Sequence, residues 1–372
     1  MTKTVVLQKC AEYSFDDVLA CIRRMMDMLP PPDVKGKTVL LKPNILYPKK
    51  PELAVGTHPV VVGAAVKAFL ERGAEKVLVG ESPAIANSTT SAKLTGVYDQ
   101  VLYNGGEWAD FHKSVIVPCP EGLVVKQFEF AEQFEEADIV VSLSKLKTHQ
   151  LMSYTGAMKN LFGLVVGLDK AKKHYQFPNK EDFGNYLIDL NIAANADYAI
   201  MDAIVGMEGP GGPGAGDPVK LGFLAASDNL LALDWECASL VGYNPHKIKY
   251  LEQALTRGNW LKSAKEIKTL GASEEECRCK NFKIVVDPAE TLGGMLPKWF
   301  DAIAQKYFVK NPHFNYKKCR MCGRCEQICP AHIINLEGPN GTAQILDRTK
   351  CIHCFCCHEI CSFGAIKLRR FY

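Results

Sequence analysis

Two runs of cysteine constrain this chain more than any other feature. Both have the spacing Cys-x2-Cys-x2-Cys-x3-Cys, and Pro330 follows the first run while Ser362 follows the second. Three thiolates at this spacing can hold one iron–sulfur cube, and the fourth turns away to the other cube. We therefore assign one [4Fe–4S] cluster to Cys319, Cys322, Cys325 and Cys361, and a second to Cys351, Cys354, Cys357 and Cys329.

A zinc site or a disulfide framework is the alternative explanation for so many cysteines. Zinc sites use pairs of two-residue clips, not triplets with a fourth cysteine three residues on. The seven remaining cysteines are scattered, unlike the frame of a secreted protein. Cys356 lies beside Cys357 and outside the spacing, and we interpret it as a packed thiol, with an extra cluster ligand as the alternative.

The length of 372 residues and the hydrophobic content of 47% indicate two or three domains with an ordinary core. We expect an α/β substrate or partner domain over residues 1–290, a connecting helix over 291–312 and a two-cluster ferredoxin domain over 313–372.

The net charge of +3 is concentrated in the last sixty residues, which hold nine Lys and Arg against four Asp and Glu. The negative charge of two thiolate-bound clusters nearly cancels this excess, so we expect no nucleic-acid partner. The chain starts without a cleavage signal, and no apolar run has the length of a membrane helix. These observations predict a cytoplasmic protein with no membrane partner.

Apolar segments alternate with helical patterns through the first 290 residues. The expected strands are residues 4–10, 38–44, 76–82, 137–143, 198–205 and 221–227, and the clearest helices are residues 14–29, 58–73 and 232–241. This alternation predicts an α/β fold with a mostly parallel sheet flanked by helices. A small α+β ferredoxin-like domain follows it.

Polar side chains gather where the expected strands end, which is where ligands bind in open α/β sheets. The segment 145–149 carries two Lys, a Thr and a His directly after an apolar strand. Thr155 can cap a helix whose free amides would hold an anion. A solvated basic face is the alternative. We expect an anionic small-molecule substrate, with His149 and Lys159 catalytic and with these residues binding it: Lys42, Asn44, His58, Lys145, Lys147, Thr155 and Glu208.

The glycine-rich segment Gly206–Gly216 contains the pattern G-x-G-x-x-G. A dinucleotide-binding loop must open a helix, whereas this one contains two Pro residues in its spacers and leads into another strand. We therefore expect a flexible loop over the site or a plain surface loop. Glu208 at its start is a candidate proton donor.

With these segments together, the chain resembles the "domain of unknown function 362" family, which is often fused to a two-cluster ferredoxin domain. The matching segments are residues 41–44, 57–59, 145–149, 154–163, 201–209 and 232–234. A fainter similarity is to lactate racemase and its nickel-pincer relatives. In those proteins a His is followed ten residues later by a Lys, as His149 is by Lys159, while His58 stands where they have an Arg. This resemblance implies a shared fold and site position.

Three functions are compatible with these features. In the first, an iron–sulfur oxidoreductase receives electrons from a redox partner protein and passes them singly to the anionic substrate, while His149 transfers protons. In the second, the chain is a non-enzymatic electron-transfer subunit that docks on a partner redox enzyme. In the third, it is a racemase-like enzyme with structural clusters. The strand-end residues favour the first.

Overall fold

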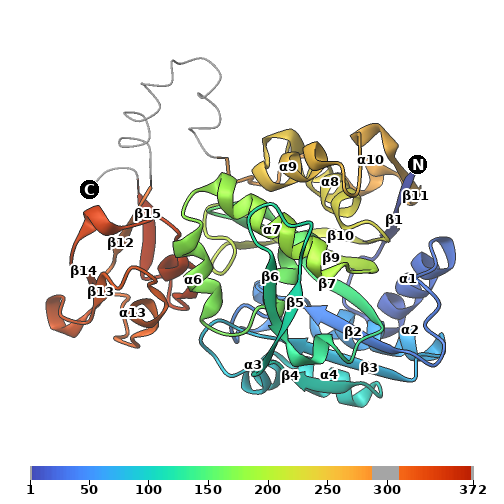
Figure 1. Cartoon of the computed structure of the whole chain (residues 1–372), viewed down its shortest axis with the longest axis horizontal. Helices are drawn as coiled ribbons and strands as arrows, with labels where there is room; N and C mark the ends of the chain where they lie inside the picture. Colours follow the sequence, from blue (N-terminus) through green and yellow to red (C-terminus); the bar gives the residue numbers. More distant parts are fainter. Residues whose placement is uncertain (1, 287–309, 370–372) are drawn as a thin grey trace.

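The computed structural model describes residues 2–286 and 310–369 (Figure 1). The first range forms an α/β domain, and the second forms a small domain beside it. Most of the expected connecting helix, residues 291–309, lies outside the described residues. Strand β12 (Asn311–Phe314) already belongs to the small domain, because it pairs with that domain's last strand.

One mixed sheet organises the α/β domain. In the described part of the chain it has nine strands in the order β11-β1-β10-β9-β7-β2-β3-β4, with β8 beside β7. All neighbours are parallel except β10, which is antiparallel to β1 and β9, and β8. The expected mostly parallel sheet is thus confirmed. The strands are β1 (Lys3–Lys9), β2 (Thr38–Pro43), β3 (Lys76–Glu81), β4 (Glu107–Asp110), β7 (Ile139–His149), β8 (Ser153–Thr155), β9 (Tyr198–Glu208), β10 (Asp217–Ser227) and β11 (Ile267–Gly271).

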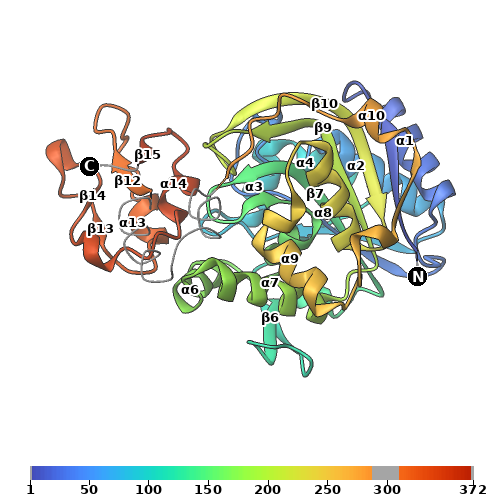
Figure 2. The ribbon, with the colours of Figure 1, turned by 90° about the horizontal axis from the view of Figure 1, so that it is seen from above.

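Helices cover both faces of this sheet (Figures 1 and 2). Because both faces are covered, β7 is buried along its whole length, as expected of a central parallel strand. One hydrophobic core lies under α1 (Phe15–Met28), α2 (Pro59–Glu71), α3 (Ser88–Thr95) and α4 (Val97–Tyr103). The other lies under α5 (Ala157–Asn160), α7 (Lys180–Ala194), α8 (Leu230–Leu240), α9 (Lys249–Arg257) and the hairpin of β5 (Ser114–Pro118) and β6 (Gln127–Ala131). The domain also contains α6 (Asp169–Gln176) and α10 (Glu274–Cys277).

Strand β7 is longer than the sequence predicted, and its extra length positions the site. We expected a strand over residues 137–143, with the polar segment 145–149 beyond its end. Pairing with β2 ends at Leu143, opposite Pro43, but β7 continues to His149 between β8 and β9. The polar segment 145–149 is therefore strand that projects beyond the end of β2. Asp202 lies within β9, opposite Lys145.

Within residues 310–369, the small domain contains two short antiparallel pairs and two α-helices. Strand β12 pairs with β15 (Ile366–Arg369), and β13 (Ile334–Asn335) pairs with β14 (Gln344–Ile345). Helices α13 (Arg324–Ile328) and α14 (Cys356–Ile360) correspond to each other in the two cysteine runs. This arrangement confirms the expected small α+β domain.

Helix α14 faces the α/β domain. Cys356 and Ile360 pack in one hydrophobic cluster with Tyr47 and Met207 of that domain. A polar contact supports this packing, because Lys49 Nζ donates a hydrogen bond of 2.7 Å to the carbonyl of Ser362. The cysteine-rich domain is thus docked beside the end of β7.

Candidate functional site

Three side chains of the candidate site come from the projecting half of β7. Lys145, Lys147 and His149 are spaced two residues apart. Alternate side chains of a strand point to the same face, so these three share one face. All three are buried, with 1%, 2% and 0% of their surface exposed. The apolar pattern of the first half of β7 thus leads into a buried polar row.

This row opens onto a cleft with about 360 Å³ of empty space. The structure brings six of the nine residues expected in the α/β domain's site to its walls: Asn44, Lys145, Lys147, His149, Thr155 and Lys159. Pro213 of the glycine-rich loop and Glu359 of α14 complete the cleft opposite them. The two domains therefore share one cavity.

Lys145 is the cation of this row that has a direct carboxylate partner. Its Nζ lies 2.9 Å from Asp202 Oδ2 and donates a 2.8 Å hydrogen bond to the hydroxyl of Tyr13. Tyr13 in turn donates to Asp202 Oδ1 at 2.9 Å. Because Asp202 neutralises the charge of Lys145 by direct contact, Lys145 stabilises the wall of the cleft and contributes little to the attraction of an anion.

Lys147 is buried among neutral acceptors. Its Nζ donates to Asn44 Oδ1 at 2.8 Å and to the carbonyls of Val55 and Pro213 at 2.5 and 3.4 Å. Burial, reinforced by the charge of nearby Lys159 and opposed by Glu359, lowers the pKa of Lys147 to about 7. Lys147 is therefore a lysine that titrates near neutral pH at the wall of the cleft.

His149 is held as one tautomer. Its Nδ1 accepts hydrogen bonds from the backbone amides of Leu151 and Met152, at 3.1 and 3.2 Å. Burial, together with the positive charge of Lys159, keeps the pKa of His149 well below its usual value, so the ring is neutral. The ring proton consequently resides on Nε2, which lies 3.3 Å from Glu359 Oε1.

The segment after β8 turns Lys159 toward the cleft, but it does not offer free amides. Asp234 accepts hydrogen bonds from the amides of Ala157 and Met158, at 2.5 and 2.9 Å. Gly156 permits this contact, because a Cβ there would lie 1.9 Å from Asp234 Oδ1. The prediction that these amides would hold an anion is therefore wrong, although Thr155 itself lines the cleft.

Lys42 does not reach the cleft. Its Nζ forms a buried ion pair with Glu81 at 2.5 Å and donates to Asn160 Oδ1 at 3.0 Å. Gly163 makes room for the pair, since a Cβ there would lie 2.2 Å from the Lys42 ammonium. Lys42 thus contacts the cleft only indirectly, because it holds Asn160, which lines the cleft.

Two further residues expected to bind ligand lie elsewhere. The His58 ring stacks on Tyr13 at 3.6 Å between centroids, and its Nδ1 accepts from the Val60 amide at the start of α2. Glu208 forms an ion pair of 2.9 Å with Lys283 Nζ. Neither side chain lines the cleft. His58 caps the start of α2, and Glu208 holds the segment after α10 through its ion pair with Lys283.

The glycine-rich loop is packed at the rim of the cleft. Thr148 Oγ1 donates a 2.8 Å hydrogen bond to the carbonyl of Gly209, and Tyr47 donates to the carbonyl of Gly214. A Cβ at Gly212 would lie 2.2 Å from Thr148 Oγ1, so glycine is required for this close approach. The loop is neither a plain surface loop nor a dinucleotide-binding turn.

Glu359 is the residue that the sequence analysis missed. It lies in α14, two residues from Cys357 and two from Cys361, within a motif already explained by its cysteines. Burial raises the pKa of its carboxyl group, while Lys159 and Lys147 lower it. The one signal available was that the corresponding position of the first run is Gln327, an uncharged residue.

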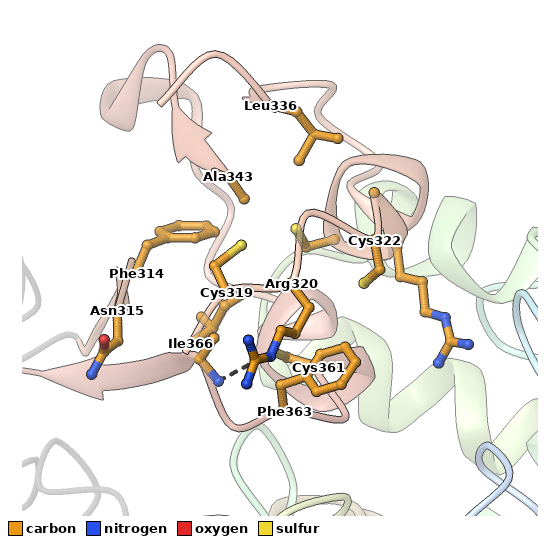
Figure 3. Close-up of a pocket in the computed structure, with 14 residues that line it drawn as sticks. Phe314, Asn315, Cys319, Arg320, Cys322, Leu336, Ala343, Cys361, Phe363 and Ile366 are labelled. Atoms are coloured by element: carbon orange, nitrogen blue, oxygen red, sulfur yellow. Dashed lines mark hydrogen bonds between the residues drawn. The ribbon is translucent and has the colours of Figure 1, made fainter. Parts of the chain in front are cut away.

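The eight motif cysteines divide into the two expected sets. Cys319, Cys322, Cys325 and Cys361 line one cavity of about 400 Å³, whose walls include Phe314, Leu336 and Ala343 (Figure 3). Cys329, Cys351, Cys354 and Cys357 line another of about 360 Å³. Four thiols around each apolar cavity fit a [4Fe–4S] cube, and each set takes its fourth member from the other run. Cys356 lines neither cavity and packs against the α/β domain.

The helices within the described ranges do not combine the length and apolar character needed to cross a membrane.

Matches to known proteins range from a sequence relative to a distant structural neighbour. The chain is 32% identical over 260 residues to the thylakoid-associated protein sll1697 of Synechocystis sp., which covers 67% of this chain and 77% of that protein. It is 35% identical over 72 residues to the DNA-directed RNA polymerase subunit Rpo3 of Methanosarcina acetivorans, covering 19% of this chain and 26% of that subunit. The solved lactate racemase apoprotein from Thermoanaerobacterium thermosaccharolyticum matches with 15% identity and a TM-score of 0.39, over 63% of this chain and 56% of that chain. This chain thus spans less than two thirds of the racemase.

Two family matches cover most of the described chain. Residues 311–362 match the 4Fe-4S dicluster domain, which supports iron–sulfur clusters in the cysteine-rich domain. Residues 39–239 match the domain of unknown function DUF362, which includes β2, β7, α5 and β9 with the cleft between them. The chain therefore belongs to the DUF362 family, with a 4Fe-4S dicluster domain joined to its α/β domain.

Proposed function

We propose that this protein is an iron–sulfur oxidoreductase that transfers single electrons to a small anionic substrate in the cleft between its two domains. Its two [4Fe–4S] clusters, held by the two cysteine sets, supply the electrons and receive them from a redox partner protein. The alternative is an electron-transfer subunit without a substrate of its own.

One observation carries this proposal: the wall of the cleft opposite the lysines belongs to the helix that bears the cluster ligands. Glu359 lines the cleft, and Cys357 and Cys361 lie two residues to either side of it. Two residues of helix rise only about 3 Å. A ligand beside Glu359 is therefore held against the segment that links the two cysteine sets.

The basic residues of the cleft favour an anionic ligand. Lys147 and Lys159 contribute charge that no carboxylate among residues 2–286 neutralises by direct contact, whereas Lys145 is paired with Asp202. Thr155 and Asn44 add neutral hydrogen-bonding groups. A hydrogen bond from an ammonium group to an anion is worth about 1.5–3 kcal/mol, which suffices to orient a small molecule.

The protonation states of the cleft suit the addition of an electron and a proton to the ligand. Lys147, with its pKa of about 7, can release a proton near neutral pH. Neutral His149 presents Nε2–H as a hydrogen-bond donor to charge that develops on the ligand. Lys159, whose pKa is lowered by burial, is the second candidate proton donor. Each electron added is thus balanced by a proton from a side chain of the cleft.

The test is anaerobic purification of the wild-type protein and a Lys159→Met variant, followed by mass spectrometry of the small molecules released from each. We expect the wild type to carry an anion that the variant lacks. When this compound is added to the chemically reduced protein, the visible absorbance of the clusters should recover in the wild type and recover more slowly in the variant.

A matched control is Lys172→Met, because Lys172 is exposed on α6 and pairs with Asp169 at the surface. This variant should behave like the wild type. If Lys159→Met reoxidises as fast as the wild type with every compound recovered, the cleft is not the site of electron transfer. The electron-transfer subunit then becomes the better account.

A further inference from the structure

Two buried polar atoms in the cleft have no hydrogen-bond partner in the described part of the chain. They are His149 Nε2 and Glu359 Oε1. They lie 3.3 Å apart, yet they are not oriented to bond each other. His149 is fully buried and cannot bond to bulk water. Since an unpaired buried polar group is costly, the pair is positioned to bond a polar group that enters the cleft, either a water molecule or part of a ligand.

The two atoms require opposite hydrogen-bonding roles of that group: one must find an acceptor and the other a donor. His149 Nδ1 already accepts two backbone hydrogen bonds, so Nε2 carries the proton and must donate. In its ionised form, which the charges of Lys159 and Lys147 favour, the Glu359 carboxylate only accepts. One oxygen or nitrogen at hydrogen-bond distance from both can satisfy them if it accepts from His149 and donates to Glu359. A hydroxyl group does both, whereas a fully deprotonated oxygen cannot.

We infer that Glu359 is a specificity residue, and that the cleft takes a small oxyanion which also carries a hydrogen-bond donor, such as a protonated phosphate or a hydroxycarboxylate. The charged oxygens of this ligand lie toward Lys147 and Lys159, and its hydroxyl lies between His149 and Glu359. The inference rests on the proposed function, because it assigns the chemistry of the same anionic ligand.

Glu359 discriminates by charge as well as by hydrogen bonding. When the oxyanion has no hydroxyl, its oxygen and the Glu359 carboxylate are both negatively charged acceptors, so they repel each other. Against an oxyanion with a hydroxyl it forms a charge-assisted hydrogen bond. Helix α14, which carries cysteines of both clusters, therefore also selects which anion binds in the cleft.

Two matched pairs of anions test this selection by isothermal titration calorimetry with the anaerobic, cluster-loaded protein. Phosphate and sulfate have the same tetrahedral shape, but only phosphate carries a hydroxyl near neutral pH. Glycolate and acetate differ by one hydroxyl in the same way. Within each pair, we expect the member with the hydroxyl to bind about tenfold more tightly or better, as one charge-assisted hydrogen bond allows. The pair that binds more tightly identifies phosphate or carboxylate as the source of the charge.

The Glu359→Gln variant should change the two members of a pair in opposite directions. Removing the negative charge should strengthen sulfate and acetate binding, and the neutral amide should weaken phosphate and glycolate binding. A loss of folding would weaken the binding of every anion, so it cannot produce these opposite changes in affinity. The matched control is Glu326→Gln, because Glu326 is exposed on α13, the corresponding helix of the first cysteine run. Iron content should equal that of the wild type in both variants.

The outcomes separate the inference from the proposed function. If both members of each pair bind equally and Lys159→Met weakens both, the cleft is an anion site but the selection by Glu359 is refuted. If no anion binds in a manner that depends on Lys159, the anionic substrate itself is refuted, and the inference falls with it. A hydroxyl preference that persists in Glu359→Gln would also overturn the role of Glu359.

Discussion

The lowered pKa of Lys147 predicts that the affinity of the cleft for anions falls as the pH rises through about 7. Burial is the main cause of the lowered value, and the charges that face Lys147 are Lys159 of α5, Glu359 of α14, Lys145 of β7 and Lys42 of β2. Only the protonated lysine offers a positive charge to the ligand. Its three neutral acceptors keep the side chain in place in either state.

The expected magnitude follows from a single linked proton. With a pKa of about 7, Lys147 is mostly protonated at about pH 6 and only a few per cent protonated at about pH 8.5. If the neutral lysine does not hold the anion, affinity should fall by about 10- to 30-fold between these values, which agrees with about 1.5–3 kcal/mol for one charge-assisted hydrogen bond.

Calorimetric titration with glycolate is a suitable assay, because glycolate stays ionised over this range. The Lys147→Met variant keeps the length of the side chain and should bind more weakly, with its dependence on pH over this range largely lost. The exposed control Lys172→Met should keep both the affinity and the pH dependence of the wild type. An affinity that is constant from about pH 6 to 8.5, or an unchanged pH slope in Lys147→Met, would refute the reasoning.

The effect on stability has the opposite sign, which separates weakened binding from unfolding. The pKa of Lys147 is lowered on folding, so the unfolded chain binds more protons between about pH 7 and the usual lysine pKa of about 10.4. The contribution of Lys147 to the free energy of unfolding therefore rises with pH across this window, while affinity for the anion falls.

Three other predictions concern the clusters and the support of the cleft. Anaerobically reconstituted protein should contain about eight irons per chain, and Cys356→Ala should retain them; about four irons, or stoichiometric zinc, would contradict the two-cube assignment. Glu81→Gln leaves buried Lys42 unpaired and should lower the free energy of unfolding, measured by urea titration, by about 3–5 kcal/mol. The control Arg23→Met breaks an exposed ion pair and should lower it by less than about 1 kcal/mol. Equal effects of the two substitutions would argue against the buried pair. Asp234→Ala should cost about 1–3 kcal/mol for each of the two amides left unpaired, and a variant as stable as the wild type would show that water replaces the carboxylate.

The sequence was sufficient to predict the features that depend on local pattern. The cysteine spacing identified the two sets that line separate cavities. The alternation of strands and helices predicted the mostly parallel sheet. The rule that ligands bind at strand ends led us to expect Lys145, Lys147 and His149 in one site, although they share a face because β7 is longer than the sequence predicted.

The sequence could not predict which polar groups are already paired across the fold. Lys42 is neutralised by Glu81, and the amides after Gly156 are occupied by Asp234, a residue nearly eighty positions away. These partners come from different strands and helices, so no local pattern reveals them. Glu359 was missed for a related reason: only the docking of the small domain brings it to the cleft.

The central claim is that the cleft and the clusters work as one unit, and a potentiometric titration tests it most directly. The midpoint potentials of the clusters are measured anaerobically with and without phosphate, in the wild type and in Lys159→Met. An anion bound beside Glu359 disfavours the addition of an electron, so phosphate should make the wild-type potential more negative and leave that of the variant unchanged, as linkage between the two equilibria requires. Identical potentials in the wild type with and without saturating phosphate would contradict the claim.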